Sequence, residues 1–271
     1  MPNKARLIFM HIPKTAGISM TSIIKANYRK NELGATRFMW QGNPDFQELT
    51  ETERRRINML CGHMPFGIHQ KMGEGPFEYF TMLREPVERV LSAYNDILTH
   101  EDHFLHKELK ENRNSFRELA ENGKWLALDN CQVRMISGSL LIPFGQINAS
   151  HLETALQNID RFFPLVGVQH RFDEFVLQLS DRYGWKFPYY RKLHVTPSRK
   201  FKSDLDEEEL AAIRRCNTFD QILFDKMSAR AEKTIADAGE DFQKRLSRYR
   251  RRNRFVVKAL NLFYPQSKPK R

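Results

Sequence analysis

A short apolar run, a tight loop and a helix open this chain, and this unit constrains the fold most strongly. Leu7–Met10 has the character of a buried parallel strand, and Pro13 and Gly17 then interrupt the pattern. The apolar residues that follow fit one face of a helix: Ile18, Met20, Ile23 and Ile24. A helix that begins after a strand offers unpaired N–H groups and the positive end of its dipole to an anion. The sequence therefore predicts an anion-binding loop near residue 15.

The side chains of this loop suit a phosphate group. Lys14 supplies a cation, Thr15 and Ser19 supply hydroxyl donors, and Gly17 lets the backbone approach a ligand closely. The spacing differs from the Gly-x4-Gly-Lys-[Ser/Thr] pattern of nucleoside triphosphate-binding loops. We call residues 14–19 the cradle.

Composition places the chain among ordinary globular proteins. It has 271 residues, 41% of them hydrophobic and 28% charged. No apolar run approaches the roughly 18 residues that a membrane span requires, and no signal peptide is visible. The three cysteines lack metal-type spacing, which favours a reducing, cytoplasmic compartment.

The net charge of +11 is concentrated at the C-terminal end. Residues 242–271 hold 11 of the 44 Lys and Arg residues and no Asp or Glu, so the remainder is balanced at 33 of each sign. This distribution argues against a nucleic-acid-coating protein, whose basic surface lies on the fold itself. We therefore expect a body of residues 1–241 and a basic tail of residues 242–271.

The tail has a helical pattern with two interpretations. Positions at alternating spacings of four and three residues are apolar, except for one that is occupied by polar Asn253. The apolar residues at these positions are Phe242, Leu246, Tyr249, Val256, Leu260 and Phe263. A basic amphipathic helix of this kind can lie on an anionic membrane surface. It can equally pack against the body and expose its basic face. Both interpretations stay open.

A second strand, Ile57–His63, is predicted to end beside the cradle. Ligands of open α/β sheets collect at the carboxyl ends of strands, where His63 falls. His63 is the first candidate for a catalytic base, and His69 and His11 are weaker candidates.

A third strand, Phe77–Leu83, leads into Arg84 and a helix that starts at Pro86. Arg84 leaves the strand end and Ser92 lies about two helical turns further along, so both can face a second phosphate. With a fourth strand at 162–168 and a helix at 172–183, strands and helices alternate. This order predicts an α/β protein of three layers, α/β/α, around a central parallel sheet.

Two of these segments resemble the sulfotransferases that use 3′-phosphoadenosine 5′-phosphosulfate (PAPS). His-Ile-Pro-Lys-Thr-Ala-Gly-Ile-Ser at 11–19 is similar to their 5′-phosphosulfate loop. Leu-Arg-Glu-Pro-Val-Glu-Arg-x-x-Ser-x-Tyr at 83–94 is similar to their 3′-phosphate motif. The resemblance is greatest to the carbohydrate type, which includes the heparan sulfate 2-O-sulfotransferases. It implies that PAPS binds at Lys14, Thr15, Ala16, Gly17, Ile18, Ser19, Arg84 and Ser92.

Three further segments resemble the same family. Gly62-His63 matches an element that supplies the base, although Cys61 stands where the heparan enzymes have a first histidine, so the acceptor class stays open. Residues 130–138 match a segment near the acceptor, where Gln132 and Arg134 either contact the acceptor or brace the loops. His194–Arg199 resembles a loop that closes over the nucleotide, which implies cofactor contacts from Thr196, Ser198 and Arg199.

The resemblance implies direct in-line transfer of a sulfuryl group from PAPS to a hydroxyl of a carbohydrate or glycolipid. Lys14 would stabilise the leaving group, His63 would accept the proton, and His69, Gln132 and Arg134 would contact the acceptor. No metal is expected: His100, His103 and His106 would wind around a helix, where they could line an acceptor cleft instead. A nucleotide kinase or hydrolase and a non-catalytic nucleotide-binding module are the alternatives.

Overall fold

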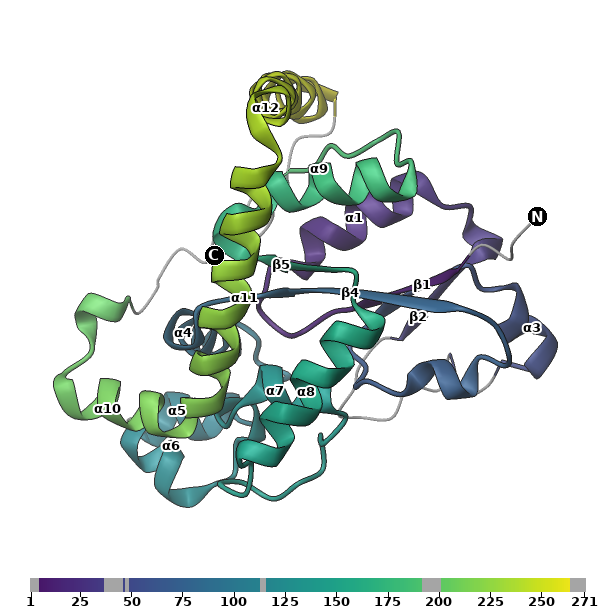
Figure 1. Ribbon diagram of the computed structural model, residues 1–271. Helices are drawn as coiled ribbons and strands as arrows, with labels where there is room; N and C mark the ends of the chain where they lie inside the picture. The colour runs from purple at the N-terminus through teal and green to yellow at the C-terminus, as the bar shows by residue number, and fades with distance from the viewer. Residues whose placement is uncertain (1–4, 37–45, 47–48, 113–115, 192–200, 264–271) are drawn as a thin grey trace.

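The computed structural model describes residues 5–36, 46, 49–112, 116–191 and 201–263. Its centre is a parallel sheet in the order β2-β3-β1-β4-β5 (Figure 1). The strands are β1 (Arg6–Met10), β2 (Leu33–Thr36), β3 (Met59–Gly62), β4 (Phe77–Leu83) and β5 (Leu165–Val168). Helices cover both faces of this sheet, so the predicted three-layer α/β/α architecture is confirmed.

The edge strand β2 was not predicted from the sequence. Its short sequence, Leu-Gly-Ala-Thr, carries no clear alternation of apolar and polar residues. Gly34 sits against Ile57 so closely that a Cβ at this position would lie 2.7 Å from the Ile57 side chain. Packing against β3 and the segment before it, rather than β propensity, therefore fixes this strand.

One face of the sheet is covered by α1 (Gly17–Asn27) and α9 (Phe172–Tyr183). Side chains from these helices form one apolar core with Phe9, Phe80 and Met82 of the sheet. The opposite face packs on α7 (Cys131–Ser137) and α8 (Ala149–Phe162), and α11 (Thr218–Asp237) passes beside β5 and contributes to both cores. Continuous apolar strands such as β1 are buried from both sides, as expected for a parallel sheet.

A separate helical cluster forms beyond the sheet around α4 (Pro86–Thr99). It includes α5 (His106–Asn112), α6 (Phe116–Asn122) and α10 (Glu207–Cys216), which share an apolar core with α4. Glu85 caps α4 by accepting from the N–H of Glu88 at 2.7 Å. The short helix α3 (Glu51–Arg56) is capped by Thr50 and leads into β3. Because α4 starts directly after β4, the cluster lies next to the carboxyl edge of the sheet.

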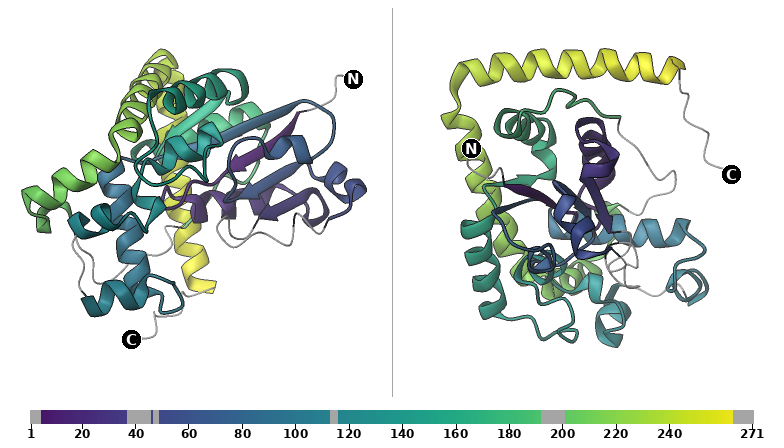
Figure 2. Two further views of the ribbon diagram at one scale, coloured as in Figure 1. Left: turned by 90° about the horizontal axis from the view of Figure 1, so that it is seen from below. Right: turned by 90° about the vertical axis from the view of Figure 1, so that its right-hand side faces the viewer.

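The last helix, α12 (Gly239–Phe263), crosses the molecule above α9 and α1 at a wide angle to α11 (Figure 2). Phe242, Leu246 and Tyr249 in its first half are buried in the core of the α1/α9 face. In its second half, Phe255 and Leu262 are 75% and 81% exposed. The first half therefore packs on the body, and the second half presents apolar side chains outward.

Among the helices that the structure describes, none combines the length and apolar character needed to cross a membrane.

Candidate active site

Three loops converge at the carboxyl edge of the sheet because β1 lies between β3 and β4. Met10, at the end of β1, is in register with Gly62 on one side and with Thr81 on the other. The cradle follows β1, His63 follows β3, and Arg84 follows β4. The topology thus brings together the three segments that the sequence analysis singled out.

The backbone of the cradle is shaped to expose its N–H groups. Lys14 and Ala16 both adopt the left-handed conformation, with φ of 69° and 68°, which is uncommon for residues other than glycine. Ala16 is the N-cap of α1 and provides no side-chain cap. No described residue accepts a hydrogen bond from the N–H groups of residues 14–19. This concave array at a helix N-terminus suits a phosphate or sulfate oxygen.

Two cradle hydroxyls have partners inside the protein. Thr15 is fully buried and donates from Oγ1 to the Ile12 carbonyl at 2.8 Å, which holds the loop in shape. Ser19 donates to the Arg191 carbonyl at 3.4 Å. Ile18 is 47% exposed, so its side chain points away from the core. What Thr15 and Ile18 offer an anion in this arrangement is their backbone N–H.

Gly17 is required by a neighbouring side chain. A Cβ at Gly17 would overlap the ring of His11, which lies directly against the helix start. The backbone dihedrals of Gly17 are those of a helix, so conformational freedom is not the reason for glycine here. The missing side chain at Gly17 does allow another group to approach the backbone closely. That group is the imidazole of His11, whereas the sequence had suggested a ligand.

Lys14 is held over the cradle by an acidic partner from α4. Its Nζ lies 2.7 Å from Asp96 Oδ1, and the two side chains are 25% and 43% exposed. Asp96 was not among the site residues predicted from the sequence. Its spacing was a usable signal, because Glu88, Ser92 and Asp96 recur every four residues and share one side of α4.

Arg84 connects the β4 loop with the cradle. Its Nη1 donates to the Lys14 carbonyl at 3.3 Å, and its Nη2 pairs with Glu88 at 3.2 Å. Ser92 lies one helical turn from Glu88 and one turn from Asp96, so its position falls between the partners of Arg84 and Lys14. The two phosphate motifs of the sequence therefore face each other across the same loop.

His63 is oriented by a backbone carbonyl. Its Nδ1 lies 2.7 Å from the oxygen of His11. A carbonyl only accepts, so Nδ1 carries the proton and Nε2 carries the lone pair in the neutral ring. The ring also stacks on the imidazole of His11, with centroids 4.1 Å apart. His63 thus has the tautomer that a proton acceptor at Nε2 requires.

Burial favours the neutral form of both stacked histidines. The pKa of His63 is lowered by burial and by nearby Lys14, against the opposing effect of its hydrogen bond to the His11 carbonyl. Burial, together with His63 and Lys14, holds the pKa of His11 well below its usual range. Two stacked imidazoles whose neutral forms are favoured therefore lie beside the cation of Lys14.

His69 lies in a different environment. It is on a short 3₁₀ helix, Ile68–Lys71, where its Nδ1 lies 2.7 Å from the Tyr79 hydroxyl. Phe66, Phe77 and Phe162 surround its ring. These contacts belong to the aromatic core on the α8 side and give His69 a packing role.

Gln132 and Arg134 are fully buried in α7, and their contacts match the bracing alternative. The side-chain amide of Gln132 accepts from the N–H of Arg84 and donates to its carbonyl, both at 3.0 Å. Arg134 pairs with buried Asp129 and donates to the carbonyls of Ile142 and Pro143. Gln132 therefore positions the backbone of Arg84, and Arg134 holds the loop after α7.

The remaining candidates divide into two groups. Thr196, Ser198 and Arg199 lie outside the described residues. His103 lies in the turn after α4, where its Nδ1 accepts from the Leu105 N–H, and His106 begins α5, with its Nδ1 in contact with the Ile97 carbonyl. Within the described ranges, no group of three or more His, Cys, Asp or Glu residues is placed to hold a metal ion.

Comparison with known proteins supports the resemblance seen in the motifs. A search of curated proteins found no match. A family model described as the sulfotransferase family matches residues 1–226, which include the cradle, His63, Arg84 and α7. The chain therefore belongs to the sulfotransferase family.

Proposed function

We propose that this protein transfers the sulfuryl group of PAPS to a hydroxyl of a carbohydrate or glycolipid acceptor. The observation that carries the proposal is the cradle, whose N–H groups have no acceptor among the described residues, with Lys14, Arg84 and His63 at its rim. PAPS carries phosphate at two positions of its ribose, in the 5′-phosphosulfate and in the 3′-phosphate. The site has two cationic residues, Lys14 and Arg84, that match these two groups. The acceptor class rests on the sequence resemblance to carbohydrate enzymes.

Positioning and charge stabilisation would dominate the catalysis, as in phosphoryl transfer. The N–H groups of residues 14–19 would hold the 5′-phosphosulfate, and Arg84 with Ser92 would hold the 3′-phosphate. The acceptor oxygen forms a bond to sulfur while the bond from sulfur to the bridging oxygen breaks, and PAP leaves. Lys14 would stabilise the charge that develops on that bridging oxygen. His63 Nε2 would take the acceptor's proton.

Titration calorimetry with PAP, ATP and a single-stranded oligonucleotide tests the donor. We expect PAP to bind in preference to the other two. Preference for ATP would favour a kinase or hydrolase, and preference for the oligonucleotide would favour a nucleic-acid-binding module. A PAPS-dependent screen of saccharide and glycolipid acceptors by mass spectrometry then tests the transfer, since a sulfated product is a direct readout.

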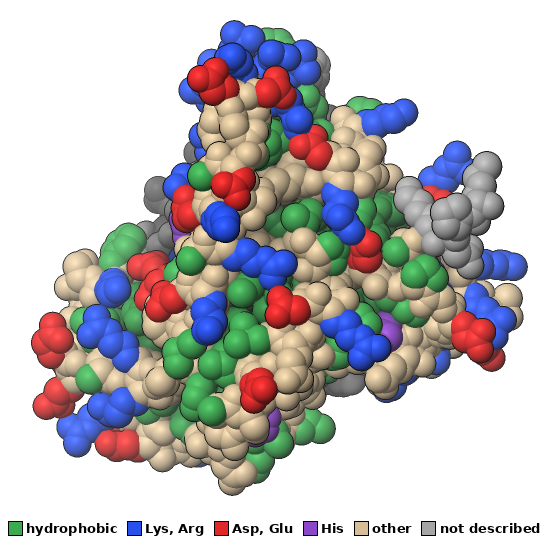
Figure 3. Space-filling view, in the orientation of Figure 1, with side chains coloured by type: hydrophobic (Ala, Val, Ile, Leu, Met, Phe, Trp, Pro, Cys, Tyr) green, Lys and Arg blue, Asp and Glu red, His purple; other side chains and the backbone are tan. Residues whose placement is uncertain are grey.

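We also propose that α12 contacts an anionic membrane surface, although not through the stripe that its sequence suggested. That stripe begins with Phe242, Leu246 and Tyr249, which the body buries. Phe255 and Leu262 lie seven residues apart on one face of the helix and are exposed. Basic residues flank them, and Figure 3 shows Lys and Arg side chains gathered over α12. Anionic lipid complements such a face, and cytoplasmic leaflets supply it.

Vesicle sedimentation tests this contact. Wild-type protein is expected to bind vesicles that contain phosphatidylglycerol and not to bind neutral vesicles. High salt should weaken the binding to the anionic vesicles. Phe255→Ser/Leu262→Ser should weaken the binding. The matched control, Phe104→Ser/Leu141→Ser, alters exposed apolar residues elsewhere and should bind normally. Equal binding of all three proteins would contradict the assigned face.

A further inference from the structure

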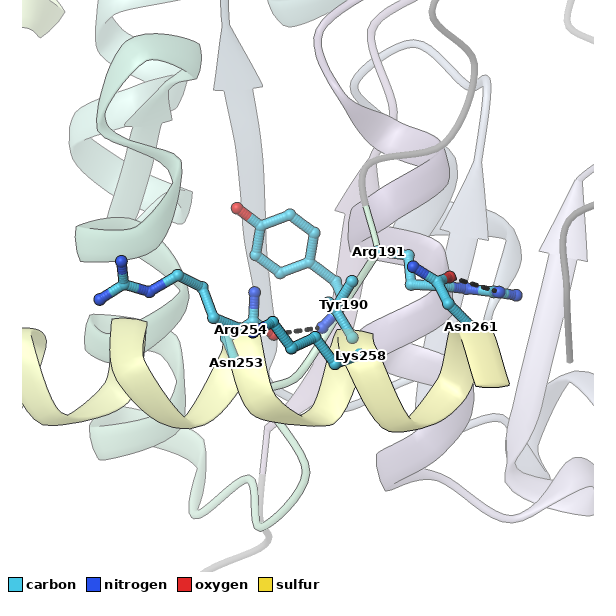
Figure 4. A pocket seen from close by; sticks show the side chains of 7 residues that line it. Tyr190, Arg191, Asn253, Arg254, Lys258 and Asn261 are labelled. Atoms are coloured by element: carbon cyan, nitrogen blue, oxygen red, sulfur yellow. Dashed lines mark hydrogen bonds between the residues drawn. The ribbon is translucent and has the colours of Figure 1, made fainter. Parts of the chain in front are cut away.

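A groove opens between the second half of α12 and the segment around Tyr190. Its volume is about 550 Å³, which is within the usual range of small-molecule sites. The lining residues are Tyr190, Arg191, Asn253, Arg254, Val257, Lys258 and Asn261. Figure 4 shows that these side chains come from two segments, residues 190–191 and the second half of α12. The groove is therefore a product of the tertiary fold and forms where α12 passes residues 190–191.

The two asparagines of the groove have a fixed orientation. Asn253 receives a hydrogen bond from the Tyr190 N–H at 3.0 Å, and Asn261 receives one from Arg191 Nη1 at 3.3 Å (Figure 4). A backbone N–H and a guanidinium only donate, so the carboxamide oxygens occupy these positions. Each Nδ2 group is left as a donor, and no described residue accepts from it.

Hydrogen-bond donors and positive charge dominate the polar side chains of the groove. Arg191, Arg254 and Lys258 contribute three cations, and no Asp or Glu is among the described residues that line it. Arg254 and Lys258 are exposed and form no ion pair with any residue in the described ranges. Charged donors of this kind bind phosphate oxygens more strongly than neutral donors do. The groove therefore complements a phosphate group.

The groove borders the exposed apolar face of α12. Arg254, Lys258 and Asn261 recur at spacings of four and three, so they share one side of the helix. Phe255 and Leu262 each follow one of these positions by a single residue, which places them about 100° further around the helix. Both are exposed. A soluble phosphate would leave this apolar face in water, whereas a phospholipid joins a phosphate to hydrocarbon and reaches both surfaces.

We propose that this groove binds the phosphate of an anionic phospholipid, whose acyl chains lie against Phe255 and Leu262. The proposal rests on the proposed membrane contact of α12 and deepens it, because it gives that contact a headgroup site. The phosphate oxygens lie against Arg254 and Lys258 and accept hydrogen bonds from the two Nδ2 groups. Diffuse attraction between a basic helix and a membrane needs no such site. The two kinds of binding therefore differ in stoichiometry and in which cations matter.

Calorimetry on the full chain with a short-chain lipid, dihexanoyl phosphatidylglycerol, tests this assignment. Below its critical micelle concentration the lipid forms no membrane surface, so diffuse surface attraction does not contribute. Wild-type protein is expected to bind one lipid per chain. It should bind dihexanoyl phosphatidylcholine much more weakly, because the net charge of that headgroup is zero and its cation is repelled by the groove.

Two double variants locate the binding. Arg254→Ala/Lys258→Ala should bind the lipid at least about tenfold more weakly, because two charge-assisted contacts are lost. The control Arg248→Ala/Arg252→Ala removes the same charge from exposed positions on the same helix outside the groove, and it should match wild type. Asn261→Asp keeps the oxygen that accepts from Arg191 and replaces the Nδ2 donor with an anionic oxygen. This variant should unfold at the wild-type temperature and bind the lipid weakly.

Several outcomes would overturn the proposal. No binding of the monomeric lipid, equal binding of the two lipids, or equal losses in the two double variants would each do so. Inorganic phosphate that binds as tightly as the lipid would assign the groove to free phosphate instead. Vesicle sedimentation on the same proteins separates this proposal from the one on which it rests. Wild-type protein that binds anionic vesicles but not the monomeric lipid refutes the groove alone, whereas failure to bind either refutes the membrane contact. PAP calorimetry on these proteins tests the donor assignment independently.

Discussion

His63 Nδ1 lies 2.7 Å from the carbonyl oxygen of His11, and this contact determines which nitrogen of His63 can accept a proton. The carbonyl belongs to the loop that leads into the cradle, so the segment proposed to receive the donor also orients the proposed base. A change in the loop is therefore expected to affect both donor binding and proton transfer.

The first prediction concerns His63 itself. A positioned base contributes about 10²–10⁴-fold, so His63→Ala should lose that factor in turnover and still bind PAP. His69→Ala should lose far less activity, because His69 packs among aromatic residues of the α8 side. Steady-state kinetics on both variants, with PAP titration as the folding control, decide between them. If only His69→Ala is inactive, the base has been misassigned.

The pH dependence follows from the lowered pKa of His63. The ring must be neutral to accept a proton, so activity falls as pH falls through its folded pKa. Because burial lowers this pKa, activity should persist below the ordinary histidine value of about 6.5. The pH–rate profile of the residual activity of His63→Ala should lack this fall at acidic pH. A wild-type midpoint well above pH 6.5 would contradict the assignment.

The second prediction separates Lys14 from its partner. Lys14→Ala should lower turnover by about 10²–10³, the range for a lost electrostatic stabiliser, with a smaller effect on PAP affinity. Asp96→Asn keeps the cation and removes a partly exposed ion pair, so its effect should be much smaller. Measured values of kcat and KM for both variants show whether Lys14→Ala loses more turnover than Asp96→Asn. Near-normal turnover of Lys14→Ala would exclude the proposed role.

The third prediction concerns the 3′-phosphate. PAP carries this group and AMP does not, so wild-type protein should prefer PAP, and Arg84→Ala should remove most of the preference. Glu88→Gln is the control, because it removes the ion-pair partner and leaves the guanidinium in place. Calorimetric affinities for both nucleotides give the result. Equal wild-type affinity for PAP and AMP would show that Arg84 does not read the 3′-phosphate.

Local sequence was sufficient to place the cradle, His63 and Arg84, since each follows an apolar strand and parallel strands align their carboxyl ends. It could not decide whether a polar side chain faces the cleft or the interior. Gln132 is a clear case: its two hydrogen bonds to the backbone of Arg84 connect residues 48 positions apart in the chain. Such contacts depend on the tertiary arrangement of β4 and α7.

The helix caps show the same limit over a shorter range. Ser150 with Glu153 fits a capping box by sequence, but the N-cap of α8 is Asn148, which accepts from the Ser150 N–H at 3.1 Å. Both residue types are good caps, so the sequence could not rank them. Asp96 was overlooked for a different reason. An acidic residue on a helix is ordinary until the structure places Lys14 beside it.

The fourth prediction tests the contact between His11 and Gly17. Alanine at a helical position gains at most about 1 kcal/mol over glycine, whereas overpacking costs about 1–3 kcal/mol. Because the new Cβ would overlap the His11 ring, Gly17→Ala should lower the free energy of unfolding and reduce turnover. In the double variant His11→Ala/Gly17→Ala the ring is gone, so the cost of the alanine should disappear. Denaturant unfolding of the single and double variants measures this coupling. Additive effects would contradict it.

The fifth prediction concerns the tail, whose two halves have different environments. Truncation after Glu240 removes Phe242, Leu246 and Tyr249 from the core, and each such loss costs several kcal/mol, about 2–5 for a large apolar side chain. That protein should be strongly destabilised.

Truncation after Arg252 keeps these three side chains and removes Phe255 and Leu262. This shorter truncation should preserve the fold and the PAP affinity but abolish binding to anionic vesicles, because the exposed apolar residues and the adjacent cations are lost together. Thermal unfolding, PAP calorimetry and vesicle sedimentation on both truncations provide the comparison. A stable protein truncated after Glu240 would show that the body does not need α12. Vesicle binding that survives truncation after Arg252 would place the membrane contact on the body.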